Sequence, residues 1–352
     1  MKILHVITDS NTHEGISVAA LDHISALRGR GVEQSVVCRP HDDFLRSLRA
    51  IEIPVETFDY NKWNKYFVQL ATRRRVRRKI KTYAPDVIHC WHERAATFIP
   101  KDGGVVSLGW DFGFGDYNLK HDAICDYYMA TRHEFVERLR RQTGRPDCVF
   151  YAHAFGTLPD DSPVHREEFD IPADKPIILM LTRMIPRKGV DVLLYAALKV
   201  DAFLLLAGDG PELDTYRALA KDLGLESRVC FAGWRQDRSA LLDLADVLAV
   251  PSRDDSAPAV MPQAWGRGVP LVASNIDGLR EHIEHGVNGM LCEVEDVDDL
   301  AKNLRMVLED AGLRERLIAG GTKAYEAKFS KEAVINNLLK TYEEIIRRGV
   351  SI

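Results

Sequence analysis

The sequence contains no long apolar run, and this absence argues against a membrane-spanning helix. A helix that crosses a bilayer needs ~20 consecutive apolar residues, and no stretch of the chain approaches that length. The apolar segment in residues 1–9 is too short for a signal peptide, and no small-residue cleavage site follows it. We therefore interpret these residues as a first buried strand and expect a cytoplasmic protein.

Paired cysteines are also lacking, because the six cysteines are scattered and none forms a C-x-x-C pair. Closely spaced pairs are the usual sign of a zinc site or a disulfide framework, so we expect reduced thiols. Low-complexity tracts are absent as well. The composition, 46% hydrophobic and 28% charged, is that of an ordinary globular α/β protein.

Short apolar segments alternate with helical patterns along the whole chain, which predicts an α/β fold with parallel sheets built from βαβ units. The expected strands span residues 2–8, 34–39, 53–58, 86–90, 104–108, 126–131, 148–152, 176–182, 202–207, 228–231, 246–250, 270–274 and 289–292. Four prolines between residues 158 and 176 mark a linker. We predict two doubly wound domains at 1–160 and 176–330, a linker at 161–175, and a helix at 331–352 that packs back on the first domain.

Two cations follow the strand expected at 176–182. Arg183 stands at the end of that strand, and Lys188 comes five residues later, where the next helix begins. Because ligands of open parallel sheets bind at the carboxyl ends of the strands, these cations suit a phosphorylated ligand at a helix N-terminus. The alternative is a pair of surface cations near a helix start.

A second loop, after the strand expected at 246–250, carries Asp254 and Asp255 and then a run of small residues that includes Ser256 and Ala257. Small residues allow the backbone to approach a ligand closely. The alternative is an Asp-rich loop that caps the next helix. Two adjacent carboxylates also suit a metal, but no third ligand stands at a suitable spacing, so we predict none.

Gly208 and Gly210 directly follow the strand expected at 202–207. Their G-x-G spacing matches the first part of a dinucleotide-binding fingerprint. However, Leu213 occupies the third glycine position and Pro211 follows the second glycine. A lone G-x-G is a weak motif, so we interpret it as a tight turn at the rim of the crevice. A nicotinamide-dependent enzyme that uses these glycines remains an alternative function.

Two loops of the first half are candidates for the other side of a cleft. Gly15 follows the first strand and opens a helix, where it would face a phosphate; the alternative is a plain turn between strand and helix. Trp110 and Asp111 lie in a glycine-rich segment whose aromatics we expect to be exposed, which suits stacking and hydroxyl bonding to a sugar. The alternative there is a folded-over loop that uses its aromatics as its own core.

The net charge is −5, yet residues 62–81 contain nine basic and no acidic residues. Aromatic and aliphatic side chains recur there at helical spacing, which is typical of a helix that lies on an anionic membrane surface. The alternative is a solvated helix face. Nucleic acid is a poorer interpretation, because no recognition motif accompanies the charge and the whole protein is acidic.

From about residue 170 to 330 the chain resembles the retaining GT-B glycosyltransferases of the large family four. The resemblance is carried by Arg183-x4-Lys188-Gly189, Gly208-Asp209-Gly210-Pro211, Pro251-Ser252 with Gln263-Ala264, Gly268-Val269-Pro270-Leu271-Val272-Ala273-Ser274, Gly278-Leu279-Arg280-Glu281 and Gly286-Val287-Asn288-Gly289. Where the family has an acidic pair spaced E-x7-E, this chain has Asp255 and Gln263. The first half fits the family's acceptor domain, but it has Glu14-Gly15 in place of paired glycines and Trp110-Asp111 in place of a histidine.

The resemblance implies two Rossmann-like domains that face a cleft and transfer of a hexose-type sugar with retained configuration, without a metal or cofactor. The catalytic residues would be Arg183, Lys188 and Asp255, and the acceptor side would be lined by Trp110 and Asp111. The donor-binding residues would be Gly15, Gly208, Gly210, Ser256, Ala257, Met261 and Gln263.

The expected partners are a nucleotide diphosphate sugar and a glycan or lipid-linked saccharide of a bacterial cell surface, with the enzyme peripheral on the inner face of the membrane. The departures at Asp255, Gln263 and Trp110 leave a second hypothesis open. It is a catalytically silent relative that binds nucleotide or glycan as a regulator or scaffold. Such a protein would bind nucleotide without turning over any sugar donor.

Overall fold

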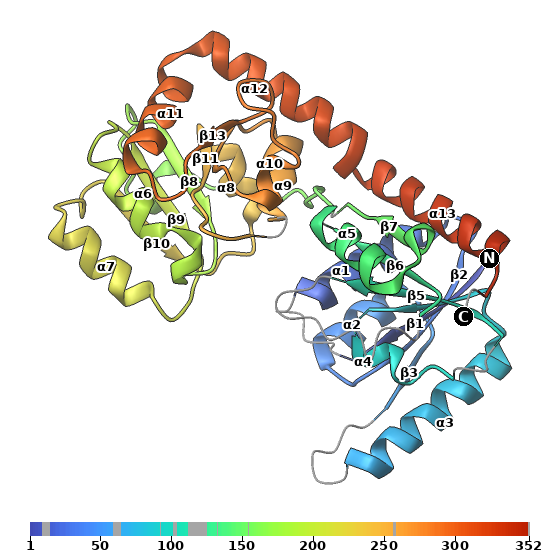
Figure 1. The fold of residues 1–352 in the computed structure, drawn as a ribbon. Coiled ribbons are helices and arrows are strands. Elements are labelled where there is room, and N and C mark those ends of the chain that lie inside the picture. Colours follow the sequence, from blue (N-terminus) through green and yellow to red (C-terminus); the bar gives the residue numbers. More distant parts are fainter. Residues whose placement is uncertain are drawn as a thin grey trace. The chain divides into compact units, whose positions relative to one another are not determined.

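The computed structural model describes residues 1–8, 15–58, 65–91, 93–100, 104–111, 125–131, 133–153, 155–255 and 258–350. The chain forms two compact units (Figure 1). Unit 1 consists of Met1–His153 and Val334–Ile352, and unit 2 of Ala154–Ala333. Each unit is built around one sheet whose described strands pair in parallel.

The sheet of unit 1 has seven strands in the order β3-β2-β1-β4-β5-β6-β7. Its strands are β1 (Lys2–Ile7), β2 (Glu33–Cys38), β3 (Val55–Thr57), β4 (Val87–Cys90), β5 (Val106–Asp111), β6 (Tyr127–Ala130) and β7 (Val149–Tyr151). Its helices are α1 (Gly15–Leu27), α2 (Asp42–Ala50), α3 (Lys65–Tyr83), α4 (Glu93–Ala96), α5 (His133–Thr143) and the short η1 (Pro146–Cys148).

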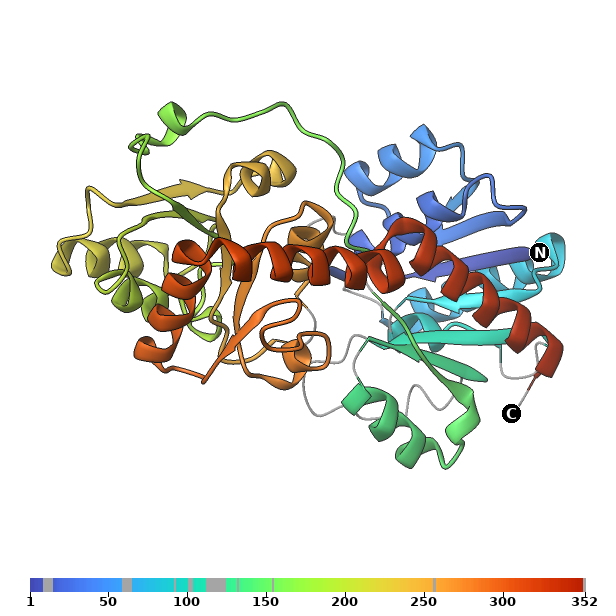
Figure 2. The same cartoon turned by 90° about the horizontal axis from the view of Figure 1, so that it is seen from above.

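Helix α13 (Lys331–Arg348) begins in unit 2 and ends in unit 1, and it is the long red helix of Figure 2. Its buried side chains recur at helical spacing: Val334, Ile335, Leu338, Thr341, Tyr342 and Ile345. Within unit 1, the hydroxyl of Tyr342 lies 2.6 Å from Nδ1 of His89 on β4. The C-terminal helix is therefore anchored to the sheet of unit 1 by its apolar face and by this hydrogen bond.

The sheet of unit 2 has six strands in the order β10-β9-β8-β11-β12-β13. Its strands are β8 (Ile177–Leu181), β9 (Phe203–Ala207), β10 (Val229–Gly233), β11 (Val247–Val250), β12 (Leu271–Ser274) and β13 (Met290–Cys292). Its helices are η2 (Arg166–Phe169), η3 (Pro186–Lys188), α6 (Val190–Ala197), α7 (Leu213–Asp222), α8 (Arg238–Leu244), α9 (Val260–Gly266), α10 (Asp277–Arg280), α11 (Val297–Glu309), α12 (Ala311–Ala324) and the π-helix η4 (Tyr325–Phe329).

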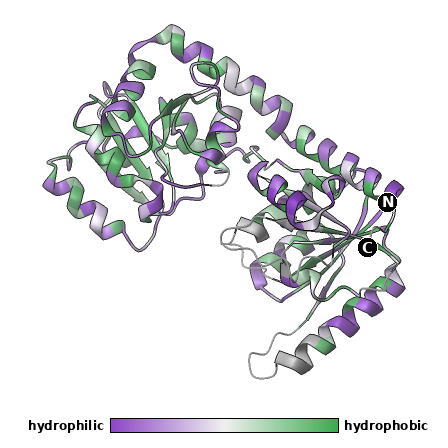
Figure 3. Ribbon diagram, in the orientation of Figure 1, coloured by the Kyte–Doolittle hydropathy of each residue, from purple (hydrophilic) through white to green (hydrophobic). Residues whose placement is uncertain are grey.

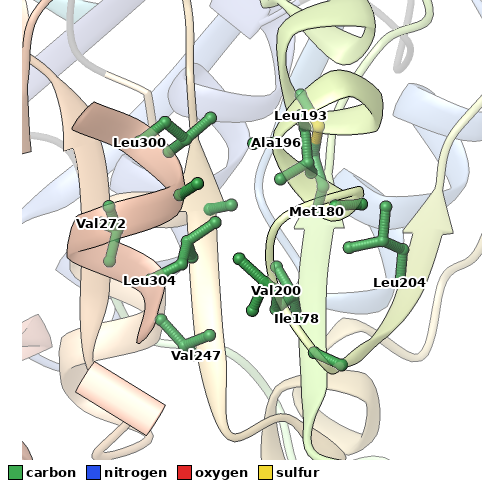
Figure 4. Close-up of a cluster of buried hydrophobic side chains, with 14 of the residues drawn as sticks. Ile178, Met180, Leu193, Ala196, Val200, Leu204, Val247, Val272, Leu300 and Leu304 are labelled. Atoms are coloured by element: carbon green, nitrogen blue, oxygen red, sulfur yellow. The ribbon is translucent and has the colours of Figure 1, made fainter. Parts of the chain in front are cut away.

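Alternate side chains of β8 enter two different apolar clusters, as the two-residue period of a strand requires. Ile178 and Met180 pack on one face with residues of α6 and α11 (Figure 4). Ile177, Leu179 and Leu181 pack on the other face with residues of α8 and α9. Both faces of the sheet are therefore covered, and apolar residues follow the strands of each unit in Figure 3.

Every strand expected from the sequence overlaps an observed strand, so the alternating α/β prediction is confirmed. The observed ends differ from the expected ones by at most three residues. None of the six cysteines, which all lie in the described part of the chain, forms a disulfide in the structure.

Candidate functional site

The candidate site of unit 2 lies where the strand order of its sheet reverses. From β8 the chain continues to β9 and β10 on one side, whereas β11, β12 and β13 extend the sheet on the other. The loops after β8 and β11 therefore leave neighbouring strands in opposite directions. Such a switch point at the carboxyl edge of a parallel sheet leaves a crevice in which ligands bind. The two loops singled out in the sequence are these two loops.

Lys188 and Asp255 form an ion pair across this switch point. Their side chains are 14% and 7% exposed, so neither charge is well solvated. The hydroxyl of Ser252 lies 3.5 Å from the same oxygen of Asp255 and donates to it. Each charge thus compensates the other while no ligand is present. Arg183, at the end of β8, is exposed at the same edge of the sheet.

Gly189 explains how the two loops come so close together. It adopts a φ of +68°, which favours glycine, between the turn of η3 and the start of α6. A Cβ built on Gly189 would overlap the carbonyl oxygen of Pro251 at the end of β11. Any other residue would push the Lys188 turn away from the Asp255 loop.

Arg253 connects the same two loops through its side chain and its backbone. No pattern in the sequence indicated this residue. Its guanidinium donates to both carboxylate oxygens of Asp191 at 2.9 and 2.6 Å and to Glu295 at 2.7 Å. Its backbone N–H donates to the carbonyl of Arg187 at 2.8 Å. Hydrogen bonding to Asp191 and to Glu295 raises the pKa of Arg253. Only its place inside the Asp255 loop could have pointed to it.

The glycines after β9 pack under the loop of β8. A Cβ on Gly208 would overlap the carbonyl oxygen of Thr182, and one on Gly210 would overlap that of Met184. The N–H of Met184 donates to the carbonyl of Asp209 at 2.9 Å. These glycines therefore hold the backbone beside Arg183 in place, whatever else they contact.

The side chain of Gln263 carries a buried hydrogen-bond acceptor for which the described residues provide no donor. It lies on α9, is 5% exposed, and its Oε1 has no hydrogen-bond partner in the part of the chain that is described. A buried acceptor without a donor costs about 1–3 kcal/mol, which a hydroxyl of a ligand would recover. The side chain of Met261, two residues earlier, is buried in the core instead. Ser256 and Ala257 lie outside the described residues.

In unit 1 the expectation of an exposed Trp110 is wrong. Its indole is 3% exposed and stacks on Trp91, with ring centroids 5.0 Å apart. The ring of His23 on α1 packs edge-on against the indole of Trp110, with ring centroids 4.7 Å apart. The alternative interpretation, aromatics that serve as core, describes Trp110 correctly. Gly15 is the first residue of α1 and Asp111 the last of β5, but their surroundings lie outside the described residues.

Three buried histidines form a cluster with these tryptophans, and no spacing in the sequence indicated it. His5 lies on β1, His23 on α1 and His89 on β4. Nε1–H of Trp91 donates to Nδ1 of His5 at 3.0 Å. Burial lowers the pKa of His5 to about 3 and that of His23 to about 4, and it holds the pKa of His89 well below its usual value. All three rings are therefore neutral at pH 7.

The basic run forms α3, which packs on unit 1 through Thr72, Val76 and Ile80. Several of its cations are bound back to the unit: Arg73 donates to the carbonyl of Thr97, and Lys79 pairs with Glu56 at 3.1 Å. Others are exposed at helical spacing, and with an exposed leucine they form the α3 stripe: Leu70, Arg74, Arg77 and Lys81. None of the described helices has the length and apolar composition needed to traverse a bilayer.

Comparison with known proteins agrees with the family resemblance of the sequence. Residues 161–324 match the family model for glycosyl transferases group 1, and residues 13–103 match that for glycosyltransferase family 4. The chain is 28% identical over 321 residues to the lipopolysaccharide core biosynthesis glycosyltransferase LpsE of Rhizobium meliloti (strain 1021), covering 90% of this chain and 92% of that protein.

Two solved structures share the fold over nearly the whole chain. A glycosyltransferase from Rickettsia africae ESF-5 superposes with a TM-score of 0.86 at 18% identity, covering 99% of both chains. Anabaena HepE in complex with UDP superposes with a TM-score of 0.83 at 20% identity, covering 98% of this chain and 100% of that one. The fold is that of the GT-B enzymes. With one family model on each unit, the chain belongs to the group 1, or family four, glycosyltransferases.

Proposed function

We propose that the protein is a retaining glycosyltransferase that moves a hexose-type sugar from a nucleotide diphosphate sugar to a glycan or lipid-linked saccharide in bacterial cell-surface polysaccharide biosynthesis. The observation that carries the proposal is the partly desolvated Lys188–Asp255 pair at the switch point of unit 2, with Arg183 exposed beside it. The lipopolysaccharide core function named for LpsE supports the pathway class, and the UDP in HepE supports the donor class.

In this proposal Arg183 and Lys188 stabilise the leaving diphosphate. The bond between the sugar C1 and the diphosphate oxygen breaks and its electron pair stays on the diphosphate, so negative charge accumulates there. The oxygen of the acceptor hydroxyl bonds to C1, and its proton passes to the departing diphosphate. Fixed cations at that place stabilise the transition state more than the ground state. Their positive charge takes the place of a metal, so neither a metal nor a cofactor is part of the proposal.

Asp255 and Gln263 orient the donor. Once Lys188 turns to the diphosphate, the carboxylate of Asp255 is available to accept hydrogen bonds from sugar hydroxyls. Oε1 of Gln263, for which the described residues provide no donor, accepts a hydrogen bond from the ribose. Binding therefore exchanges an internal ion pair for contacts with the ligand.

The α3 stripe supports a second part of the proposal, which places the enzyme on the inner face of a membrane where lipid-linked acceptors are found. Arg74, Arg77 and Lys81 are exposed along one line of α3, with Leu70 at its start. Cations beside an anionic lipid surface contribute about 1 kcal/mol each, and an exposed leucine adds apolar contact.

The test is a panel of nucleotide sugars, in which binding and turnover are measured on the same samples. Melting temperatures report binding, because a ligand at 100 times its Kd stabilises a protein by about 2.7 kcal/mol. Release of nucleoside diphosphate, with and without a saccharide acceptor extract, reports turnover. Stabilisation by one donor together with its turnover supports the proposal. Stabilisation without any turnover supports the silent relative instead, and no stabilisation contradicts both.

A further inference from the structure

The chain passes between the two units twice, and the two connecting segments touch each other on the side of unit 2. The boundaries fall between His153 and Ala154 and between Ala333 and Val334. The N–H of Gly156 donates to the carbonyl of Phe329 at 2.9 Å. The two segments therefore form one joint rather than two independent connections.

Two hydroxyl groups are central to this joint. Oγ1 of Thr157 lies 2.9 Å from the hydroxyl of Tyr325, and the N–H of Lys331 donates to the same Oγ1 at 3.2 Å. The hydroxyl of Thr157 thus links the first segment to η4 and to the first residue of α13. Thr157 itself is exposed, so its hydrogen bonds are not needed to satisfy a buried group.

The first connecting segment contacts α9 at two places, Gly156 and Asp160. A Cβ built on Gly156 would lie 2.8 Å from Cβ of Pro262 in the first turn of α9. Farther along the segment, Asp160 accepts from Arg267, the residue after α9, at 2.7 Å. The segment is therefore held against the helix at these two points.

The second segment is fixed to the same helix. The ring of Tyr325 covers Gly266, where an added Cβ would lie 2.8 Å from the ring. The ring of Phe329 packs on Trp265 with centroids 5.8 Å apart. Both connecting segments are therefore in van der Waals contact with α9, whose side chains are mostly buried.

Helix α9 is also the helix of the candidate donor site, because it follows the Asp255 loop and carries Gln263. We propose that the Thr157–Tyr325 hydroxyl pair is a positioning element, which holds both connecting segments in register with α9 and so restricts how freely unit 1 moves relative to unit 2. Packed interfaces shift between discrete arrangements rather than deform smoothly. A displacement of α9 on donor binding would thus be passed to both segments together.

Removing either hydroxyl tests this role with little disturbance of packing. Tyr325→Phe keeps the ring on Gly266, and Thr157→Val keeps the shape of the side chain. We expect either variant to bind nucleoside diphosphate within twofold of the wild type, because neither residue lies at the switch point. Transfer kcat should fall about fivefold, the equivalent of one hydrogen bond of about 1 kcal/mol, and donor hydrolysis per transfer should rise.

Three further variants separate positioning from a general loss of stability. Thr157→Ser keeps the hydroxyl and should restore the wild-type ratio of transfer to hydrolysis. Tyr195→Phe removes a hydroxyl from an exposed tyrosine on α6 and should change nothing. The double variant of Thr157 and Tyr325 should be no worse than Thr157→Val alone, because that single variant already removes the hydrogen bond between the two hydroxyls. An unchanged transfer-to-hydrolysis ratio in both single variants would overturn the role.

This role presupposes the transfer reaction proposed for the chain, so one measurement must be independent of activity. Small-angle X-ray scattering of the ligand-free protein reports how widely the unit-to-unit distance is distributed. We expect a broader distribution for Thr157→Val and Tyr325→Phe than for the wild type, Thr157→Ser and Tyr195→Phe. If the distance distributions of the variants and the wild type were equal, the positioning role would be contradicted, even if the protein transferred no sugar. A broader distribution in Thr157→Val and Tyr325→Phe supports the role whether or not the protein transfers sugar.

Discussion

Lys188 and Asp255 show at the scale of single residues how two charges can stand at a sheet edge with little contact with water. Both side chains are largely buried, and an isolated charge there would be costly. Their ion pair removes that cost without ligand, and the strand-end loops on which they stand keep them at the sheet edge. The sequence indicated both residues, but not that they pair.

The buried histidines are a residue-scale feature that the sequence could not indicate. His5, His23 and His89 come from three different elements, and only the folded sheet brings them together. Sequence spacing detects residues that share one helix face or one strand, and it carries no information about pairs that meet through tertiary packing. The same limit explains why an exposed Trp110 was expected where a buried one is found.

These histidines predict that unit 1 is destabilised by mild acid. Their pKa values are lower in the folded protein than the ordinary value near 6.5, about 3 for His5 and about 4 for His23. Below pH 6.5 the unfolded chain binds protons that the folded chain does not, so stability present above that pH is lost as the pH falls toward 4. The loss is about 1.4 kcal/mol per pH unit for each histidine.

Pulse proteolysis in urea at pH 7.5 and 5.5, scored on fragments of unit 1, measures this dependence. We expect a loss of about 4 kcal/mol between these values from the three histidines. His23→Gln should reduce the loss by about one third, whatever it does to stability at pH 7.5. Unit 2 is the internal control, because its histidines at 165, 282 and 285 are not buried. Equal stability of unit 1 at both pH values would contradict this account.

At the scale of elements, the strands were the most predictable part of the molecule. Central strands of a parallel sheet are covered on both faces. In the sequence they are therefore short continuous apolar runs between turn residues. This is the pattern of β8, β9 and β11, and each was placed within one residue at both ends. Contacts between the loops that follow them, such as the hydrogen bonds of Arg253 with Asp191, were not predictable, because they depend on how the strands are ordered.

Two glycines of unit 2 offer a matched test of how tightly these loops are packed. Gly189 and Gly224 both have a φ of +68°, but only Gly189 faces a close neighbour, the carbonyl of Pro251. Gly224→Ala should cost about 1–2 kcal/mol for the backbone conformation alone. Gly189→Ala should cost at least ~2 kcal/mol more, because of the clash. Urea unfolding of unit 2 measures both, and equal costs would show that the loops can move apart.

Helix α3 carries the prediction about membranes. Replacing Arg74, Arg77 and Lys81 by Gln should weaken sedimentation with vesicles that contain anionic phosphatidylglycerol by about 100-fold, the equivalent of ~1 kcal/mol per cation. Added salt should weaken wild-type binding too. The control replaces three exposed cations of unit 2, Lys302, Arg305 and Arg316, by Gln. If both triple variants bind vesicles equally, α3 is a solvated helix face and not a membrane contact.

At the scale of the whole molecule, the donor side was easier to derive than the acceptor side. Most of the proposed donor-side residues of unit 2 stand in loops directly after predicted strands, where local sequence determines their place. In unit 1, the donor-binding candidate Gly15 and the acceptor-side candidate Asp111 stand at the borders of segments outside the described residues. The match to LpsE covers 90% of this chain and 92% of that protein, so it includes residues of both units.

The central claim is that the switch point between β8 and β11 holds a nucleoside diphosphate through Lys188. Calorimetric titration of the wild type, Lys188→Ala and Lys199→Ala with a panel of nucleoside diphosphates tests it most directly. Lys199 is an exposed lysine of unit 2 that pairs with Asp298, so its loss should change the affinity by less than twofold. Lys188→Ala removes a charge-assisted bond of about 1.5–3 kcal/mol and should weaken binding about 10- to 150-fold. If Lys188→Ala bound the same diphosphate as tightly as the wild type, the site would lie elsewhere.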